Sequence, residues 1–241
     1  MTFHHLHQST TTNKGLMSTI LRLITYGLIL LLCQGETALG QEFSLEKVDI
    51  QETSIGKTLK SILNPHGFRI LNEQGKSWCE VWSRQEITST QEPASPDAQY
   101  PSFYSGLLLG LMRFPADGSD YRGLPIKKGM YTMRYGVIPQ DGNHVGASPI
   151  VDFVLLIPMN QDGHPPDAHL SSQDLVELSR KASGTNHPTV INLAFPPDSL
   201  NKAILEEDDL HHWVLSLPVT VKSKPSSEMI LSIIVYGQAT G

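Results

Sequence analysis

The sequence predicts a mainly β protein, a Greek-key β-sandwich with two short helices, preceded by an N-terminal signal helix. The first observation is a pair of apolar segments at the centre of the chain, 130–138 and 150–157, joined by a polar loop. The second is that these belong to about nine strand-like segments, most of them bounded by Gly, Pro, Asn or Asp. The third is that only 55–63 and 171–183 have a helical period outside the N-terminus.

Composition and charge are those of an ordinary globular protein. The chain has 241 residues, of which 39% are hydrophobic and 17% charged, and its formal net charge is -6. An acidic protein lacks the basic face that a nucleic-acid partner requires. The single run of like charges, Glu206-Glu207-Asp208-Asp209, is short. We therefore expect one β-sandwich domain over residues 41–241, with no nucleic acid as partner.

Residues 1–40 are predicted to be a signal peptide region, and Met17 is a plausible true start. Arg22 precedes the apolar run 23–33, and the small residues Ala38 and Gly40 fit cleavage before Gln41. The run is about half of the roughly 20 residues that a spanning helix needs. We expect export to the periplasm or beyond and no membrane span after cleavage. The alternative is an uncleaved anchor that tethers the protein to the membrane.

Cleavage would leave Cys79 as the lone cysteine, which excludes an internal disulfide. Cys79 lies in a strand-like pattern, so we expect a buried thiol rather than a reactive one.

The elements before the central pair follow from periodicity and turn residues. In chain order they are an extended lead-in 41–51, the helix 55–63 with Ser54 as its cap, strands 68–71 and 77–84 about a turn, a polar loop 88–99 and an apolar strand 100–114. Strict alternation along 77–84 places Trp78 and Trp82 on the same face. Such a pair would form an aromatic platform for a glycan if exposed, and part of the core if buried.

The central pair predicts its own faces. Tyr131, Met133, Tyr135 and Val137 form the more apolar face of the first strand and should point to the core. The second strand is apolar on both faces, which indicates a strand covered on two sides. Asp152 at its start must therefore lie at the rim or be paired, and Arg134 is the nearest candidate partner.

The last third of the chain begins with the clearest helix. Ser171 is followed by Asp174, Arg180 and Lys181 lie in the last turn, and Gly184 ends the helix. The strands expected after it are 189–195, 210–221 and 229–236.

Two stretches resemble known patterns. Phe68 to Trp82 and Leu124 to Tyr135 resemble strands of prealbumin-like and carboxypeptidase-regulatory-like sandwiches. Together, Gly129 to Tyr135, Asp141 to His144, Asp152 to Leu156 and His187-Pro188 are similar to a family of uncharacterised exported bacterial proteins. The resemblance covers most of residues 43–241. It implies a β-sandwich and export, and it implies no activity.

The sequence contains no complete catalytic or nucleotide-binding motif. Gly56-Lys57-Thr58 and Gly75-Lys76-Ser77 end like phosphate loops, but both lack the earlier glycine. There is no Gly-x-Ser-x-Gly elbow and no His-Glu-x-x-His. We therefore expect a non-catalytic binding module for a protein or glycan partner.

Two groups of residues are candidate sites. Asp162, His164, Asp167 and His169 lie within eight residues and could hold a divalent metal such as zinc, which gives the alternative function of a metal-binding protein or metal-dependent hydrolase. The other reading of this segment is a solvated loop. A binding site at the rim of the sandwich would use Arg134, His144, Asp152 and His187.

Overall fold

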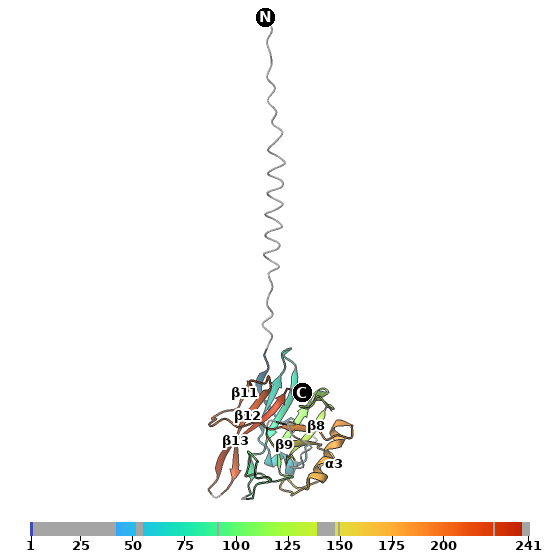
Figure 1. Ribbon diagram of the computed structural model, residues 1–241, viewed down its shortest axis with the longest axis vertical. Coiled ribbons are helices and arrows are strands. Elements are labelled where there is room, and N and C mark those ends of the chain that lie inside the picture. Colours follow the sequence, from blue (N-terminus) through green and yellow to red (C-terminus); the bar gives the residue numbers. More distant parts are fainter. Residues whose placement is uncertain are drawn as a thin grey trace. The chain divides into compact units, whose positions relative to one another are not determined.

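The computed structural model (Figure 1) describes residues 1, 42–51, 55–90, 92–138, 148, 150–223 and 225–237. The chain divides into two units, Met1–Gln41 and Glu42–Gly241. The predicted signal peptide region, Ser54 and His144 lie outside the described residues. Neither helix of the described ranges is long and apolar enough to cross a membrane.

The larger sheet of the second unit has seven antiparallel strands. Their order across the sheet is β1 (Ser44–Asp49), β2 (His66–Leu71), β3 (Ser77–Ser83), β5 (Leu108–Phe114), β8 (Gly129–Val137), β9 (Asp152–Pro158) and β10 (Val190–Asn192). The order follows the chain, except that β4 (Glu86–Thr88), β6 (Gly118–Ser119) and β7 (Pro125–Ile126) belong to other sheets.

The smaller sheet is built mainly from the end of the chain. Its members are β11 (Ile204–Glu207), β12 (Trp213–Lys222) and β13 (Ser227–Tyr236), with β4 (Glu86–Thr88) added parallel to β12. Leu193, just after β10, forms a bridge with Ile233 of β13. A short pair, β6 (Gly118–Ser119) and β7 (Pro125–Ile126), stands apart from both sheets. The predicted mainly β sandwich with two short helices is confirmed.

The main core contains side chains from both sheets. Met133, Tyr135 and Leu156 of the larger sheet are each at most 1% exposed, and they share one buried cluster with Leu215 and Ile233 of the smaller sheet. The face of β8 that was predicted to point to the core does so. Cys79 is also in this cluster, and burial raises the pKa of its thiol, as expected for an unreactive cysteine.

Helix α3 (Ser172–Ser183) covers the second face of β9, which confirms the strand covered on two sides (Figure 1). Leu175 of the helix packs with Leu155 and Ile157. The helix begins where the sequence predicted, because Ser171 and Asp174 form a reciprocal capping box, and it ends at Gly184, whose φ of 68° is left-handed.

Two of the predicted elements, the first helix and the strand 100–114, are shorter than expected. Helix α2 (Lys57–Ile62) is shorter than 55–63, and its N-cap, Gly56, offers no side-chain hydrogen bond. The expected strand 100–114 starts only at Leu108, because the chain turns at Gly106, with a φ of +95°. Strands β4 and β11 were missed, since such short segments are defined by their pairing with β12 rather than by a local pattern.

Candidate functional site

Arg134 is saturated by the protein itself. Its side chain is 1% exposed, and its Nε and Nη2 donate to the two carboxylate oxygens of Asp162 at 2.6 and 2.9 Å. Its Nη1 donates to the carbonyl oxygens of Gly106 and Pro165, and Nη2 also donates to that of His164. An arginine has five N–H donors, and these five bonds use them all. Arg134 therefore fixes the segment after β9 against the sheet and has no donor left for a ligand.

Asp162 is equally occupied. Its carboxylate is 1% exposed, and besides Arg134 it accepts hydrogen bonds from the Thr132 hydroxyl and from the backbone N–H of His164. A carboxylate whose oxygens already accept these bonds would have to break a buried ion pair to bind a metal ion.

The other three predicted metal ligands are engaged separately or face solvent. Asp167 accepts from Nη1 of Arg84 at 2.7 Å. Partial burial would raise the pKa of Asp167, but the hydrogen bonds from Arg84 and Thr88 and the positive charges of Arg84 and Lys222 together outweigh it and hold the pKa below the usual value. The ring of His169 stacks on Tyr104, with centroids 4.0 Å apart, and His164 is exposed. No three His, Cys, Asp or Glu side chains in the described ranges are placed to hold a metal ion, so the geometry gives the predicted metal site no support.

Asp152 is not paired with Arg134, so that predicted pair is wrong. Its side chain is completely buried and accepts from the backbone N–H groups of Gln99 at 2.8 Å and Tyr100 at 3.1 Å. The hydroxyl of Tyr135 donates to it at 2.6 Å. Burial, and then this hydrogen bond, raise the pKa of Tyr135 far above its usual value. Asp152 thus joins the 99–100 segment to the core strands.

The structure does not assemble the predicted rim site from the members that it describes. Arg134 and Asp152 are each saturated by different partners. His187 is exposed in the loop after α3, where its carbonyl oxygen accepts from the Ser183 hydroxyl at 2.7 Å. His144, the fourth member, lies outside the described residues.

Trp78 and Trp82 lie on opposite faces of β3, which excludes a shared aromatic platform and leaves the other expectation, that the two side chains pack in the core. Ile70 pairs with Cys79, but Leu71 pairs with Ser77, which leaves Trp78 as the extra residue of a β-bulge. Trp78 packs against the main core, and its Nε1 donates to the carbonyl oxygen of Val235. Trp82, 2% exposed, is buried in the separate cluster beneath α2. The bulge reverses the alternation that the sequence prediction assumed.

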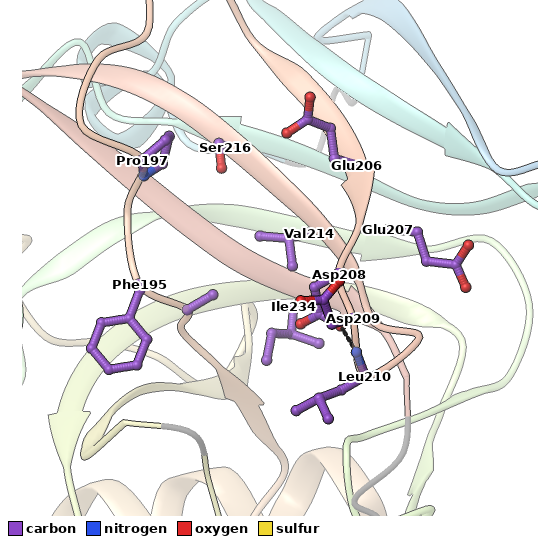
Figure 2. A pocket seen from close by; sticks show the side chains of 11 residues that line it. Phe195, Pro197, Glu206, Glu207, Asp208, Asp209, Leu210, Val214, Ser216 and Ile234 are labelled. Atoms are coloured by element: carbon purple, nitrogen blue, oxygen red, sulfur yellow. Dashed lines mark hydrogen bonds between the residues drawn. The ribbon is translucent and has the colours of Figure 1, made fainter.

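A cleft of about 510 Å³ lies on the outer face of the smaller sheet, and sequence reasoning missed it (Figure 2). Val214 of β12 and Ile234 of β13 form its base. Figure 2 shows the segment of Phe195 and Pro197 on one side and the acidic side chains on the other. The acidic run 206–209 was the sequence signal, but its position opposite residues 194–197 depends on the pairing of β11 with β12.

The acidic wall of the cleft, residues 206–209, has an ordered half, Glu207 and Asp208, and a half without ion pairs among the described residues, Glu206 and Asp209. The Asp208 carboxylate accepts from the backbone N–H groups of Leu210 and His212 and bonds to Nδ1 of the buried His212, each at 2.9 Å. Partial burial would raise the pKa of Asp208, but the bonds from His212 and Leu210 outweigh it and lower the pKa below its usual value. Glu207 pairs with His211 at 2.8 Å. Glu206 and Asp209 have no ion pair with any described residue.

Two large apolar side chains at this cleft are exposed. Phe195 is 61% exposed and Leu210 is 51% exposed, and both line the cleft. Exposed apolar groups that gather beside polar ones mark interaction surfaces, whereas single ones are ordinary. Here the two lie with Val214 and Ile234 and beside carboxylates, so apolar and anionic groups meet in one concave surface.

Comparisons of the chain with protein-family models, curated proteins and solved structures found no match. The resemblance to exported bacterial sandwich proteins therefore stays a prediction.

Proposed function

We propose that this protein is an exported, non-catalytic binding module that holds a basic, partly apolar segment of a partner protein in the cleft of the smaller sheet. The observation that carries the proposal is the meeting of exposed Phe195 and Leu210 with the carboxylates of Glu206 and Asp209, which have no ion pair among the described residues. Export is supported by the sequence of residues 1–40.

The chemistry of the cleft selects the kind of partner. An apolar side chain of the partner would cover Phe195, Leu210 and Val214, and removing such surface from water stabilises a complex by roughly 25 cal/mol per Å². A lysine or arginine beside it would meet Glu206 and Asp209. Complementary charge also speeds encounter and makes it sensitive to salt.

A protein partner fits better than a glycan. Sugar rings bind by stacking on exposed aromatic faces, and the Trp78–Trp82 platform is absent because the two side chains lie on opposite faces of β3. Among the described residues that line the cleft, Phe195 is the one aromatic side chain, and it lies beside carboxylates and aliphatic groups. The alternative of a metal-binding protein or hydrolase has no donor cluster behind it in the described ranges. Metal analysis of the purified protein tests that alternative directly.

The proposal is tested by fluorescence anisotropy with two labelled peptides of equal length, one alternating lysine and leucine and one alternating glutamate and leucine. We expect saturable binding of the lysine peptide that weakens as salt is raised. Phe195→Ser, and the pair Glu206→Gln with Asp209→Asn, should each weaken it by about tenfold or more, which is about 1.4 kcal/mol.

The matched control is Glu177→Gln, which removes an exposed carboxylate of α3 that does not line the cleft. It should leave the affinity unchanged. Equal binding of the glutamate peptide, or equal losses in the control and the cleft variants, would refute the proposal.

A further inference from the structure

We propose a second binding site, for a small aliphatic carboxylate, at Arg69, Glu80 and Arg113 on the outer face of the larger sheet. It is independent of the cleft in the smaller sheet. We call these three residues the Arg–Glu–Arg ladder.

The ladder is set by strand register. Arg69 of β2 is aligned with Glu80 of β3, which is aligned with Arg113 of β5. Glu80 is the buried member, with a side chain 2% exposed; its Oε1 accepts from Nε of Arg69 at 2.8 Å and its Oε2 from Nη1 of Arg113 at 2.9 Å. One buried carboxylate therefore fixes the orientation of two guanidinium groups from two sides.

The two arginines keep donors that the protein does not use. Each gives one hydrogen bond to Glu80, and the remaining N–H groups have no hydrogen-bond acceptor in the described ranges. Their side chains are 35% and 43% exposed, so these donors are accessible. Nη1 of Arg69 lies 3.8 Å from the half-exposed carboxylate of Glu46, too far for a hydrogen bond. Arg134, on the same sheet, shows the contrasting case in which all five donors are used.

A hollow of about 320 Å³ adjoins the ladder. The apolar part of its lining comes from Val48, Met130 and Trp82. The polar part comes from the two arginines and Glu80 of the ladder, with Asp49 and Gln51. Its volume is at the lower end of ligand sites, which are roughly 300–1,000 Å³. The hollow is therefore sized for a small molecule rather than for a segment of protein.

Charge and shape select a monocarboxylate. The planar fork of a guanidinium matches the two oxygens of a carboxylate. The ladder itself carries one excess positive charge. Asp49, which lines the hollow and is bonded to the ring of His66 at 2.6 Å, adds a negative charge that offsets it. A multiply charged anion such as phosphate would be repelled by Asp49 and Glu80 more strongly than a singly charged carboxylate. The short aliphatic chain of that carboxylate would be covered by Val48 and Met130.

The test is an NMR titration of the full chain, labelled with ¹⁵N at tryptophan, with hexanoate, 1-hexanol and inorganic phosphate as separate probes. The chain has three tryptophans, and the indole of Trp82 is a local reporter because Trp82 lines the hollow and its Nε1 is buried with no hydrogen-bond partner among described residues. Trp82→Phe assigns its signal. We expect hexanoate to shift the Trp82 signal saturably and to leave those of Trp78 and Trp213 in place.

Arg69→Gln and Arg113→Gln should each weaken hexanoate binding by about tenfold or more, because each removes a charged hydrogen-bond donor. Arg180→Gln, which removes an exposed arginine of α3, is the matched control and should change nothing. Thermal unfolding checks that each variant is folded. If Arg69→Gln does not fold, Arg113→Lys keeps the charge without the fork and should still weaken binding.

Other results overturn the assignment. A static Trp82 signal in the folded protein, or equal hexanoate affinity in Arg113→Gln and wild type, would reduce the ladder to a structural feature of the sheet. Phosphate or hexanol binding as tightly as hexanoate would exclude a carboxylate site.

Discussion

Two regions on the outer faces of the sheets differ in how their charged side chains are satisfied. On the larger sheet, Arg134 and Asp162 are each 1% exposed, and each is satisfied by the other together with neighbouring protein groups. On the smaller sheet, Glu206 and Asp209 border an open cleft without a partner among the described residues. The first pair holds the fold together, and the second leaves its charge available to another molecule.

The comparison separates two meanings of a conspicuous polar residue. A buried charge is tolerated only where every donor and acceptor is satisfied, so its partners are structural. An exposed charge beside exposed apolar side chains costs the fold little, so it can serve a partner instead. Three of the sequence-predicted site residues, Arg134, Asp152 and Asp162, are of the first kind, and the cleft contains residues of the second kind.

Arg134→Met should cause the largest loss of stability among the variants that test this comparison. It leaves Asp162 buried without its cation, and we expect a loss of about 3–5 kcal/mol in the free energy of unfolding measured with urea. Arg180→Met, at an exposed arginine of α3, should change it by less than about 0.5 kcal/mol. A loss below about 1 kcal/mol in Arg134→Met would mean that the five hydrogen bonds are not needed to keep the segment in place.

Asp152→Asn extends the comparison to the core. Both Asp152 oxygens accept from donors, so an amide nitrogen in place of one of them would face a donor. We expect a loss of about 2–3 kcal/mol in urea unfolding, as for hydrogen bonds to charged groups. Asp198→Asn, at an exposed position, is the control. A neutral result for Asp152→Asn would place that residue at the rim, as the sequence first allowed.

Asp208→Asn tests the ordered half of the acidic wall through pH. The pKa of Asp208 is lowered in the folded protein, so its contribution to stability is present above the unfolded pKa, about 4, and is lost as pH falls through the folded value. As pH falls below about 4, the free energy of unfolding should therefore decrease less in the variant than in wild type. The difference should be under about 1 kcal/mol, because the carboxylate is 37% exposed. Urea unfolding at a series of pH values measures this, and parallel profiles would contradict it.

Phe195→Ser is expected to have the smallest effect on stability. Its side chain is 61% exposed, so we expect a change within about 0.5 kcal/mol. Phe103→Ala, at a completely buried phenylalanine, should instead cost about 3–5 kcal/mol in the same unfolding assay. A large loss in Phe195→Ser would show that this residue stabilises the fold rather than the cleft.

The elements with strong local signals could be predicted from the sequence. Alternation along 131–137 identified the core face of β8, and the two apolar faces of 150–157 identified a strand covered on both sides. The capping box of Ser171 with Asp174 located the start of α3. These features depend on residues within one or two turns of each other, where periodicity and hydrogen-bonding chemistry are sufficient.

Tertiary structure alone decided the partners. Asp152 was the predicted partner of Arg134, but Arg134 pairs with Asp162 instead. The reason is that the segment after β9 crosses back over the sheet. The bulge at Trp78 separated the two tryptophans, since it depends on how β2 and β3 are paired and not on the composition of either strand. The cleft required β11 and the segment 194–197 to meet at the smaller sheet. Sequence periodicity fixes which face a side chain takes within one regular strand, whereas contacts between distant segments depend on how the whole chain packs.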